Sequence, residues 1–146
     1  MERHPEAIPL YTRALKIYEL RLGPNHADVA VTLNDLAVLH FNQRNFNEAE
    51  KLYKKALETY ETVLHHTTPH HTTQHANSNT QKVFGKVHPD VGQALCNLAE
   101  FYKAQLNYAE ARTHLERAVS IFTSMFGSDH TKAVAARASL AAIEDL

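Results

Sequence analysis

One unit recurs three times along this chain of 146 residues. Each copy opens with an alanine, places a tyrosine or leucine four residues later and then a second alanine, as in Ala49, Tyr53 and Ala56. Each copy closes on a Gly-x-x-His phrase, which stands at Gly23, Gly85 and Gly127. The copies lie 42 residues apart once a 20-residue insertion in one interval is discounted. Repetition at this period predicts stacked helical hairpins, which bury their apolar faces against one another.

The apolar residues recur at three- and four-residue steps, the period of a helix with one buried face. This pattern predicts an all-α fold without strands. Six helices are expected, at residues 6–22, 28–43, 47–64, 89–105, 108–126 and 131–144. Pro9 is expected in the first turn, where a missing N–H costs least, and Gly23 is expected to cap the first helix in a left-handed conformation.

The six helices alternate between two types. A-type helices carry the phrase Leu-x-x-Leu-Ala, and B-type helices carry the alanine phrase described above. The order along the chain is B-A-B-A-B-A, so the first B-type helix lacks an A-type helix before it. We therefore expect residues 1–146 to form a single repeat domain that is a fragment of a longer array.

Charge and composition argue against several classes of protein. Lysine and arginine number 15 against 16 acidic residues, a balance that disfavours nonspecific nucleic-acid binding. No apolar run reaches the roughly 18 residues that span a membrane, and residues 1–5 lack the apolar core of a signal peptide. Cys96 is the only cysteine, so no internal disulfide can form, and a cytoplasmic location is expected.

The insertion occupies residues 65–83 and is rich in histidine and threonine. Because it holds no acidic and no large apolar residue up to Gln81, it cannot build a core, and a flexible surface loop is expected. Imidazole groups bind zinc, copper and nickel, so a metal-responsive loop is an alternative. The tract offers no cysteine or carboxylate to complete a ligand set, and no metal site is expected; the histidines concerned are His65, His66, His70, His71 and His75.

Two pairs of helices resemble the tetratricopeptide repeat. The first pair matches its pattern at Leu33, Leu36, Ala37, Ala49, Tyr53 and Ala56. The second pair matches at Leu98, Ala99, Tyr102, Ala111, Leu115 and Ala118. The alanines would allow two helices to approach closely, while the larger side chains fill the space between turns.

The positions that depart from the usual tetratricopeptide pattern point to one subtype of the repeat. The repeat is 42 residues long, leucine stands where tryptophan is usual (Leu33, Leu95), and alanine stands where glycine is usual (Ala37, Ala99). These features resemble repeats of the kinesin-light-chain and nephrocystin type. The resemblance implies a right-handed superhelical array of antiparallel helix pairs, a TPR-like α-solenoid, that serves motor–cargo adaptors or ciliary and signalling scaffolds.

In such arrays the A-type helices line a concave groove that binds extended peptides or a partner helix. Matched position by position, the resemblance implies groove-facing residues on two A-type helices. On the first these are Val31, Asn34, Asp35, Val38, Phe41 and Asn42. On the second they are Gln93, Cys96, Asn97, Glu100 and Lys103.

One groove position has a particular role in the family, where an asparagine just before the Leu-Ala pair binds the ligand backbone. Asn97 occupies this place, whereas Asp35 and Ser139 occupy it in the other two units. A carboxylate accepts hydrogen bonds but cannot donate one to a peptide carbonyl. The hydrogen bond to the ligand backbone that is common in the family is therefore expected at Asn97 and not at Asp35.

Several residues admit two interpretations. His26, His88 and His130 recur once per unit and are expected to serve helix entry or inter-repeat hydrogen bonding, because a repeat spacing of roughly 10 Å is too long for shared metal ligation. Cys96 could act as a nucleophile, but its helix implies no oxyanion donors. Phe41 could anchor a ligand or pack against a neighbouring helix.

The sequence therefore predicts a non-enzymatic interaction module that binds a protein or peptide ligand and needs no cofactor, since it contains no glycine-rich phosphate loop and no paired-carboxylate motif. Nucleic acid and membrane are not expected as partners. One alternative is a self-associating array, in which the first B-type helix pairs with the last A-type helix of another chain. The other alternative is the metal-responsive loop.

Overall fold

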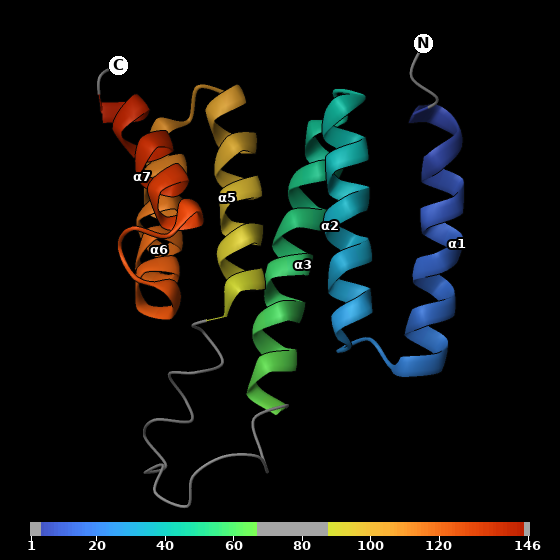
Figure 1. The fold of residues 1–146 in the computed structure, drawn as a ribbon. Coiled ribbons are helices and arrows are strands. Elements are labelled where there is room, and N and C mark those ends of the chain that lie inside the picture. Colours follow the sequence, from blue (N-terminus) through green and yellow to red (C-terminus); the bar gives the residue numbers. More distant parts are fainter. Residues whose placement is uncertain (1–3, 67–87, 145–146) are drawn as a thin grey trace, which may run out of the picture. The chain divides into compact units, whose positions relative to one another are not determined.

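The computed structural model describes residues 4–66 and 88–144, which form six α-helices (Figure 1). In chain order these are α1 (His4–Leu22), α2 (Ala27–Asn42), α3 (Phe46–His66), α5 (Pro89–Ala104), α6 (Tyr108–Phe126) and α7 (Thr131–Glu144). No strand occurs in the two described ranges, which confirms the all-α prediction. Every predicted helix end lies within two residues of the observed one.

The expected position of Pro9 is wrong. Because α1 begins at His4, Pro9 lies inside the helix, beyond its first turn. Pro5 instead takes the second position of α1, where a proline is favourable because its missing N–H would be unpaired in any case. At Pro9 the helix loses one backbone hydrogen bond.

Most of the predicted insertion lies outside the described residues. α3 continues to His66, two residues into the insertion, and the description resumes at His88. The expectation of a flexible loop therefore stays a prediction. The chain divides into two compact units, Met1–Val63 and Leu64–Leu146.

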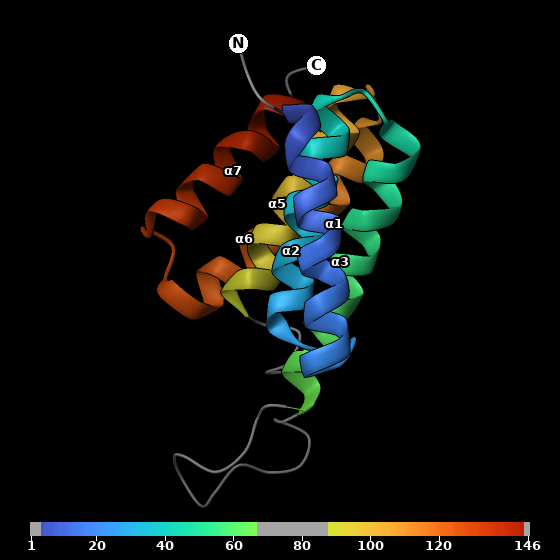
Figure 2. The same cartoon turned by 90° about the vertical axis from the view of Figure 1, so that its right-hand side faces the viewer.

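The first unit contains α1, α2 and nearly all of α3, which run alongside one another in Figure 2. Val29 and Leu33 of α2 and Ala56 of α3 form a buried cluster. Leu15 of α1 and Leu52 of α3 pack against this cluster, so all three helices share one core. At the surface, Lys55 of α3 pairs with Glu19 of α1 at 3.2 Å.

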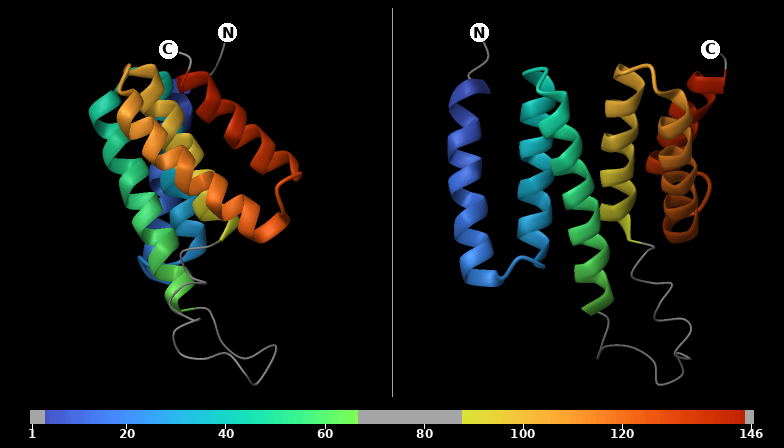
Figure 3. Two further views of the ribbon diagram at one scale, coloured as in Figure 1. Left: turned by 90° about the vertical axis from the view of Figure 1, so that its left-hand side faces the viewer. Right: turned by 180° about the vertical axis from the view of Figure 1, so that it is seen from behind.

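The second unit contains α5, α6 and α7, with α5 packed on α6 and α6 packed on α7 (Figure 3). Its fully buried side chains include Leu95, Leu98 and Phe101 of α5 and Leu115 and Phe122 of α6. Ala99, Ala111 and Ala118 are completely buried as well, in line with the expectation that alanines permit close packing of the helices. α5 and α6 approach closely at Gly92, where an added Cβ would meet the Phe122 ring at 2.8 Å.

A histidine caps the start of each A-type helix. The Nδ1 atoms of His26, His88 and His130 accept hydrogen bonds from the backbone N–H groups two residues later, each at 3.2 Å. The acceptor role requires the imidazole proton to sit on Nε2. Each bond satisfies one of the four N–H groups that a helix start leaves unpaired. The predicted role of these histidines in helix entry is confirmed.

The turns that leave α2 and α5 have the same geometry. In the first, Arg44 adopts a φ of 62°, and the N–H groups of Arg44 and Asn45 donate to the carbonyls of Phe41 and His40. In the second, Leu106 adopts a φ of 61°, and the equivalent bonds form at Leu106 and Asn107. This is the Schellman motif with a residue other than glycine in the left-handed position.

Glycine ends two of the B-type helices. Gly23 follows α1 with a φ of +89°, and Gly127 follows α6 with a φ of +88°. A side chain would be strained at these dihedral angles, which explains glycine at both places. The predicted left-handed cap at Gly23 is confirmed.

Candidate functional site

The six candidate positions on α2 all retain solvent exposure. Val31 and Asn42 are exposed, and the other four are partly buried. The buried residues of α2 precede these candidates or alternate with them along the chain, and they include Val29, Leu33 and Leu36. The helical period therefore separates the candidates from the core of the first unit. The accessible side of α2 carries three apolar residues, Val31, Val38 and Phe41, together with the polar Asn34, Asp35 and Asn42.

Asp35 and Phe41 have specific neighbours. Partial burial raises the pKa of the Asp35 carboxyl above its ordinary value, and a hydrogen bond with the Asn34 side chain opposes this rise. The ring of Phe41 packs against the ring of Phe46, which begins α3, with 6.0 Å between centroids. Phe41 therefore packs on the neighbouring helix while part of its ring stays accessible.

The candidates on α5 form a polar row along one side of the helix. The Nε2 of Gln93 donates to the Oδ1 of Asn97 at 3.3 Å, one helical turn later. The Nζ of Lys103 donates to the carboxylate of Glu100 at 3.0 Å. The row therefore places two amides, one carboxylate and one ammonium group at successive turns of α5, with Gln93 and Glu100 exposed and Asn97 and Lys103 half-buried.

Cys96 lies beside this row and is a poor nucleophile. Burial raises the pKa of its thiol to about 11, the nearby Glu100 carboxylate adds to the rise, and Lys132 of α7 opposes it. At neutral pH the thiol is protonated, and the thiolate is the form that attacks electrophiles. The nucleophilic alternative for Cys96 has no support in this environment.

A hollow of about 390 Å³ lies at the turn between α2 and α3, and the sequence did not point to it. His40, Arg44, Phe46 and Glu48 line it, together with Asn45 and Asn47. The Nδ1 of His40 is buried and has no hydrogen-bond partner among the described residues. None of the eleven predicted positions lines this hollow, although Phe41 contacts Phe46 at its edge.

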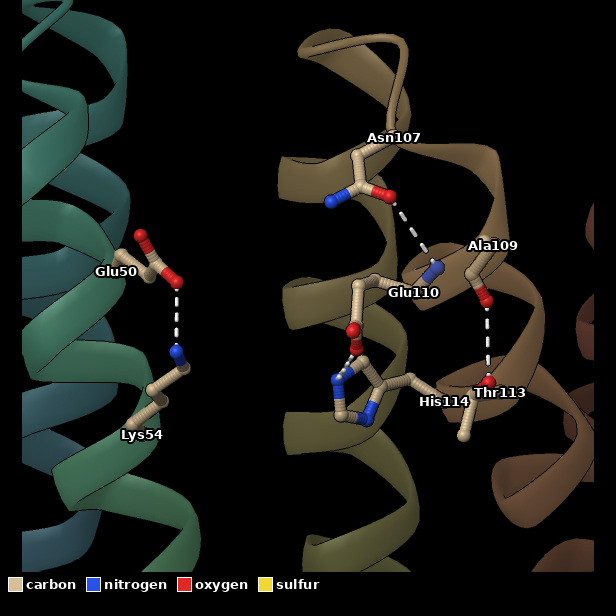
Figure 4. Close-up of polar contacts among 7 residues, drawn as sticks. All are labelled: Glu50, Lys54, Asn107, Ala109, Glu110, Thr113 and His114. Atoms are coloured by element: carbon tan, nitrogen blue, oxygen red, sulfur yellow. Dashed lines mark hydrogen bonds and ion pairs between the residues drawn. The ribbon is translucent and has the colours of Figure 1, made fainter.

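The polar contacts drawn in Figure 4 lie within single helices or at a helix start and support the helices themselves. Glu50 and Lys54 of α3 pair across one turn at 2.6 Å. At the start of α6, the Asn107 side chain accepts from the Glu110 N–H, and the His114 ring lies 3.8 Å from the Glu110 carboxylate. Contacts at this spacing stabilise a helix surface. They do not gather groups from distant parts of the chain, as a catalytic site would.

The metal alternative concerns residues that the structure largely leaves undescribed. His70, His71 and His75 lie outside the described residues, and only the backbone of His65 and His66 is described, at the end of α3. Within residues 4–66 and 88–144, no three His, Cys, Asp or Glu side chains gather as a metal site requires. None of the helices in these ranges is long and apolar enough to cross a bilayer.

Comparison with protein families gives one match over most of the chain. A family model described as tetratricopeptide repeat matches residues 1–62 and 79–146. Nephrocystin-3 of Xenopus laevis is 39% identical over 51 residues, which are 35% of this chain and 4% of that protein. Nephrocystin-3 of Xenopus tropicalis matches to the same extent. The chain thus spans a small part of the length of these relatives.

Two solved structures share the fold at low sequence identity. BtubC (BKLC) from P. vanneervenii superposes with a TM-score of 0.76 at 23% identity, over 98% of this chain and 49% of that one. A putative kinesin light chain of Podosopora anserina, with TPR-like repeats, gives a TM-score of 0.68 at 20% identity. That match covers 98% of this chain and 58% of the other. Both confirm the predicted fold, a TPR-like α-solenoid.

Proposed function

Because this chain belongs to the tetratricopeptide repeat family, we propose that the exposed faces of α2 and α5 bind an unfolded peptide segment of a partner protein. Repeats of this family are in general protein–protein interaction modules without catalytic groups. We infer from the chemistry of the eleven predicted positions that the peptide binds there.

The polar row of α5 is the observation that carries this proposal. Amides at Gln93 and Asn97 can both donate and accept, which is what a peptide backbone requires of a partner. Glu100 and Lys103 add one charge of each sign at the next turn of the same side. An extended peptide exposes backbone donors and acceptors in alternation, and these amides can pair with both.

The exposed face of α2 offers a different chemistry. Val31, Val38 and part of Phe41 form an apolar surface, and Asp35 stands where α5 has Asn97. Asp35 can accept from a peptide N–H but cannot donate to a peptide carbonyl. We infer that α2 contacts apolar side chains of the ligand and that α5 holds its backbone.

Two isosteric substitutions test whether α5 binds the ligand backbone and α2 its apolar side chains. Peptides of about twelve residues would first be selected from a displayed random library on the wild-type chain, and their affinities would then be measured by calorimetry. Asn97→Asp keeps the shape of the side chain but removes its donors, so affinity should fall about 3- to 10-fold, the value of one hydrogen bond. Asp35→Asn adds donors and should raise affinity or leave it unchanged.

Alanine variants extend the test to the charged part of the row. Asn97→Ala combined with Lys103→Ala should weaken binding by at least the loss seen for Asn97→Asp. Lys51→Ala, which removes a well-exposed lysine from α3, serves as the matched control and should bind as the wild type does. Unchanged affinity in the double variant would remove α5 from the binding surface.

We further infer an adaptor or scaffold role in the cytoplasm. The even balance of charge and the single cysteine support this inference, since neither favours nucleic acid nor a disulfide-rich extracellular fold. Binding to one peptide should be modest, because an extended segment loses conformational entropy when it docks.

A further inference from the structure

We propose that Lys132, in the first turn of α7, binds an acidic side chain of the peptide that the second unit holds. Lys132 is not among the eleven predicted binding positions, and it adds a positive charge beside the polar row of α5. This inference rests on the proposed function, because it names the chemistry of the ligand that binds there.

The first turn of α7 differs from that of the other two A-type helices. Asp28 in α2 and Asp90 in α5 stand two residues after the capping histidine, and Lys132 stands at this place in α7. A carboxylate is favourable near the positive end of the helix dipole, whereas an ammonium group is unfavourable there. A residue that breaks such a local rule is expected where it serves a function.

The accessibility of this position is a property of the repeat. Asp28 and Asp90 are exposed although a B-type helix follows each of them in the chain, and Lys132 is exposed in the same way. On α5, Gln93 and Asn97 follow Asp90 by three and seven residues and so share its side of the helix. Lys132 therefore occupies the register of the proposed binding positions.

The neighbours of Lys132 place its charge beside α5. Its Nζ lies 5.7 Å from the centroid of the Phe122 ring, a distance at which an aromatic ring attracts a cation. Burial raises the pKa of the Cys96 thiol on α5, Glu100 adds to the rise and Lys132 opposes it. The Lys132 charge thus acts on the part of α5 that carries the polar row.

The charges on this surface are not all balanced. The Nζ of Lys103 lies 3.0 Å from the Glu100 carboxylate, so these two charges offset each other. In the described range 88–144, Lys132 forms no ion pair with a carboxylate. One positive charge is therefore left over beside the row, and an acidic side chain of the ligand is its complement.

An extended peptide can reach both helices at once. Its successive side chains point to opposite sides of its backbone. With the backbone held by the amides of Gln93 and Asn97, a side chain on the α7 side can meet Lys132. The contact with the Phe122 ring restricts the lysine before binding, which reduces the conformational entropy that binding costs.

Peptide selection on two forms of the chain tests the proposal. Displayed random peptides would be selected on the wild type and on Lys132→Asp, which gives α7 the residue type that α2 and α5 carry. The wild type should enrich Asp or Glu at one peptide position, and the variant should lose this enrichment or replace it with Lys or Arg. Lys51→Asp, at an exposed lysine of α3, is the matched control and should select as the wild type does.

Thermal unfolding separates this role from a structural one. Lys132→Asp keeps the backbone N–H that donates to His130 and places a carboxylate in the first turn. The variant should therefore unfold at a temperature no lower than that of the wild type. A clearly lower temperature with unchanged peptide selection would assign Lys132 to packing on Phe122 and overturn the proposal.

Calorimetry measures the ion pair directly. Replacing the acidic residue of a selected peptide with its amide should weaken binding to the wild type about 2- to 5-fold, the value of one exposed ion pair. The same replacement should leave the affinity for Lys132→Gln unchanged, whereas Lys132→Arg should keep the preference. The effect should shrink as NaCl rises over about 0.05–0.5 M, because salt screens exposed charges.

Asn97→Asp distinguishes failure of this inference from failure of the proposed function. If peptides lose affinity for Asn97→Asp but the wild type and Lys132→Asp select the same residues, α5 binds peptide without Lys132, and only this inference is overturned. If the library yields no binding peptide on the wild type, both are overturned.

Discussion

Gly92 of α5 lies so close to Phe122 of α6 that a Cβ atom on residue 92 would stand 2.8 Å from the ring. The Cγ2 atom of Ile121 would lie 3.3 Å from the same Cβ. Phe122 is among the largest fully buried side chains of the described chain, so its ring has little room to move. The spacing of α5 and α6 therefore depends on the missing side chain at residue 92.

Gly92→Ala should destabilise the second unit. Overpacking of a core costs about 1–3 kcal/mol, and the better helix propensity of alanine returns up to about 1 kcal/mol. We expect a net loss of about 1–2 kcal/mol in urea unfolding. Adding Phe122→Leu should remove the clash, so the double variant should lose less than the sum of the two single variants. A stabilised or strictly additive result would contradict the close packing.

His88→Ala should lower stability by about 1 kcal/mol, because the N–H of Asp90 then loses its side-chain acceptor. His88→Asn supplies another good capping side chain and should stay within a few tenths of a kcal/mol of the wild type. Thermal unfolding of both variants at one pH makes the comparison. Equal losses in the alanine and asparagine variants would show that the imidazole matters for a reason other than capping.

Asp35→Asn should make the first unit more stable at neutral pH. The pKa of Asp35 is raised in the folded state, so between the unfolded value of 3.8 and the folded value the native state binds more protons. Stability from this group is therefore highest at low pH and falls as pH rises through that window. Above the folded pKa, the partly buried Asp35 carboxylate lowers the free energy of unfolding by its full desolvation cost.

Urea unfolding at a series of pH values checks whether stability falls as the Asp35 carboxyl loses its proton. The stability difference between Asp35→Asn and the wild type should be small below the ordinary aspartate pKa and should grow to a plateau above the folded one. Asp28→Asn, on the exposed first turn of the same helix, is a useful comparison because it removes the same charge. A difference for Asp35→Asn that is equal at acid and neutral pH would refute the burial effect.

The thiol of Cys96 should react slowly with alkylating reagents. A pKa of about 11 reduces the thiolate fraction at neutral pH about 100-fold relative to a thiol with the ordinary pKa of 9.0. Iodoacetamide should therefore modify the native chain at least about 100-fold more slowly than the chain unfolded in urea, because burial also limits access. Comparable rates in the two states would show that the Cys96 thiol is not buried as described.

Much of the fold follows from periodicity in the sequence. The alanines of the repeat and the leucines of the A-type helices lie in the cores where the pattern places them, because a helical period of 3.6 residues leaves few alternatives for an apolar stripe. The position of Pro9 was misjudged because Pro5 already provides a favourable start, and the helix then continues through the second proline.

Other features depend on backbone geometry that no residue type signals. Arg44 and Leu106 adopt left-handed conformations, where sequence reasoning expects glycine. The hollow beside His40 follows from this turn and was not predictable for the same reason. The histidine caps were predictable as a helix-entry role from their recurrence, but the acceptor atom was not, since imidazole is an uncommon cap.

The central functional claim is that a peptide binds to the accessible faces of the A-type helices α2 and α5. Amide NMR spectra of the labelled chain, recorded as a selected peptide is added, test it most directly. The account predicts shifts concentrated at Gln93, Asn97, Glu100 and Lys103 of α5 and at Val31, Asp35 and Val38 of α2. Shifts confined to the B-type helices, for example at Glu50, Lys54 and Glu110, would contradict it.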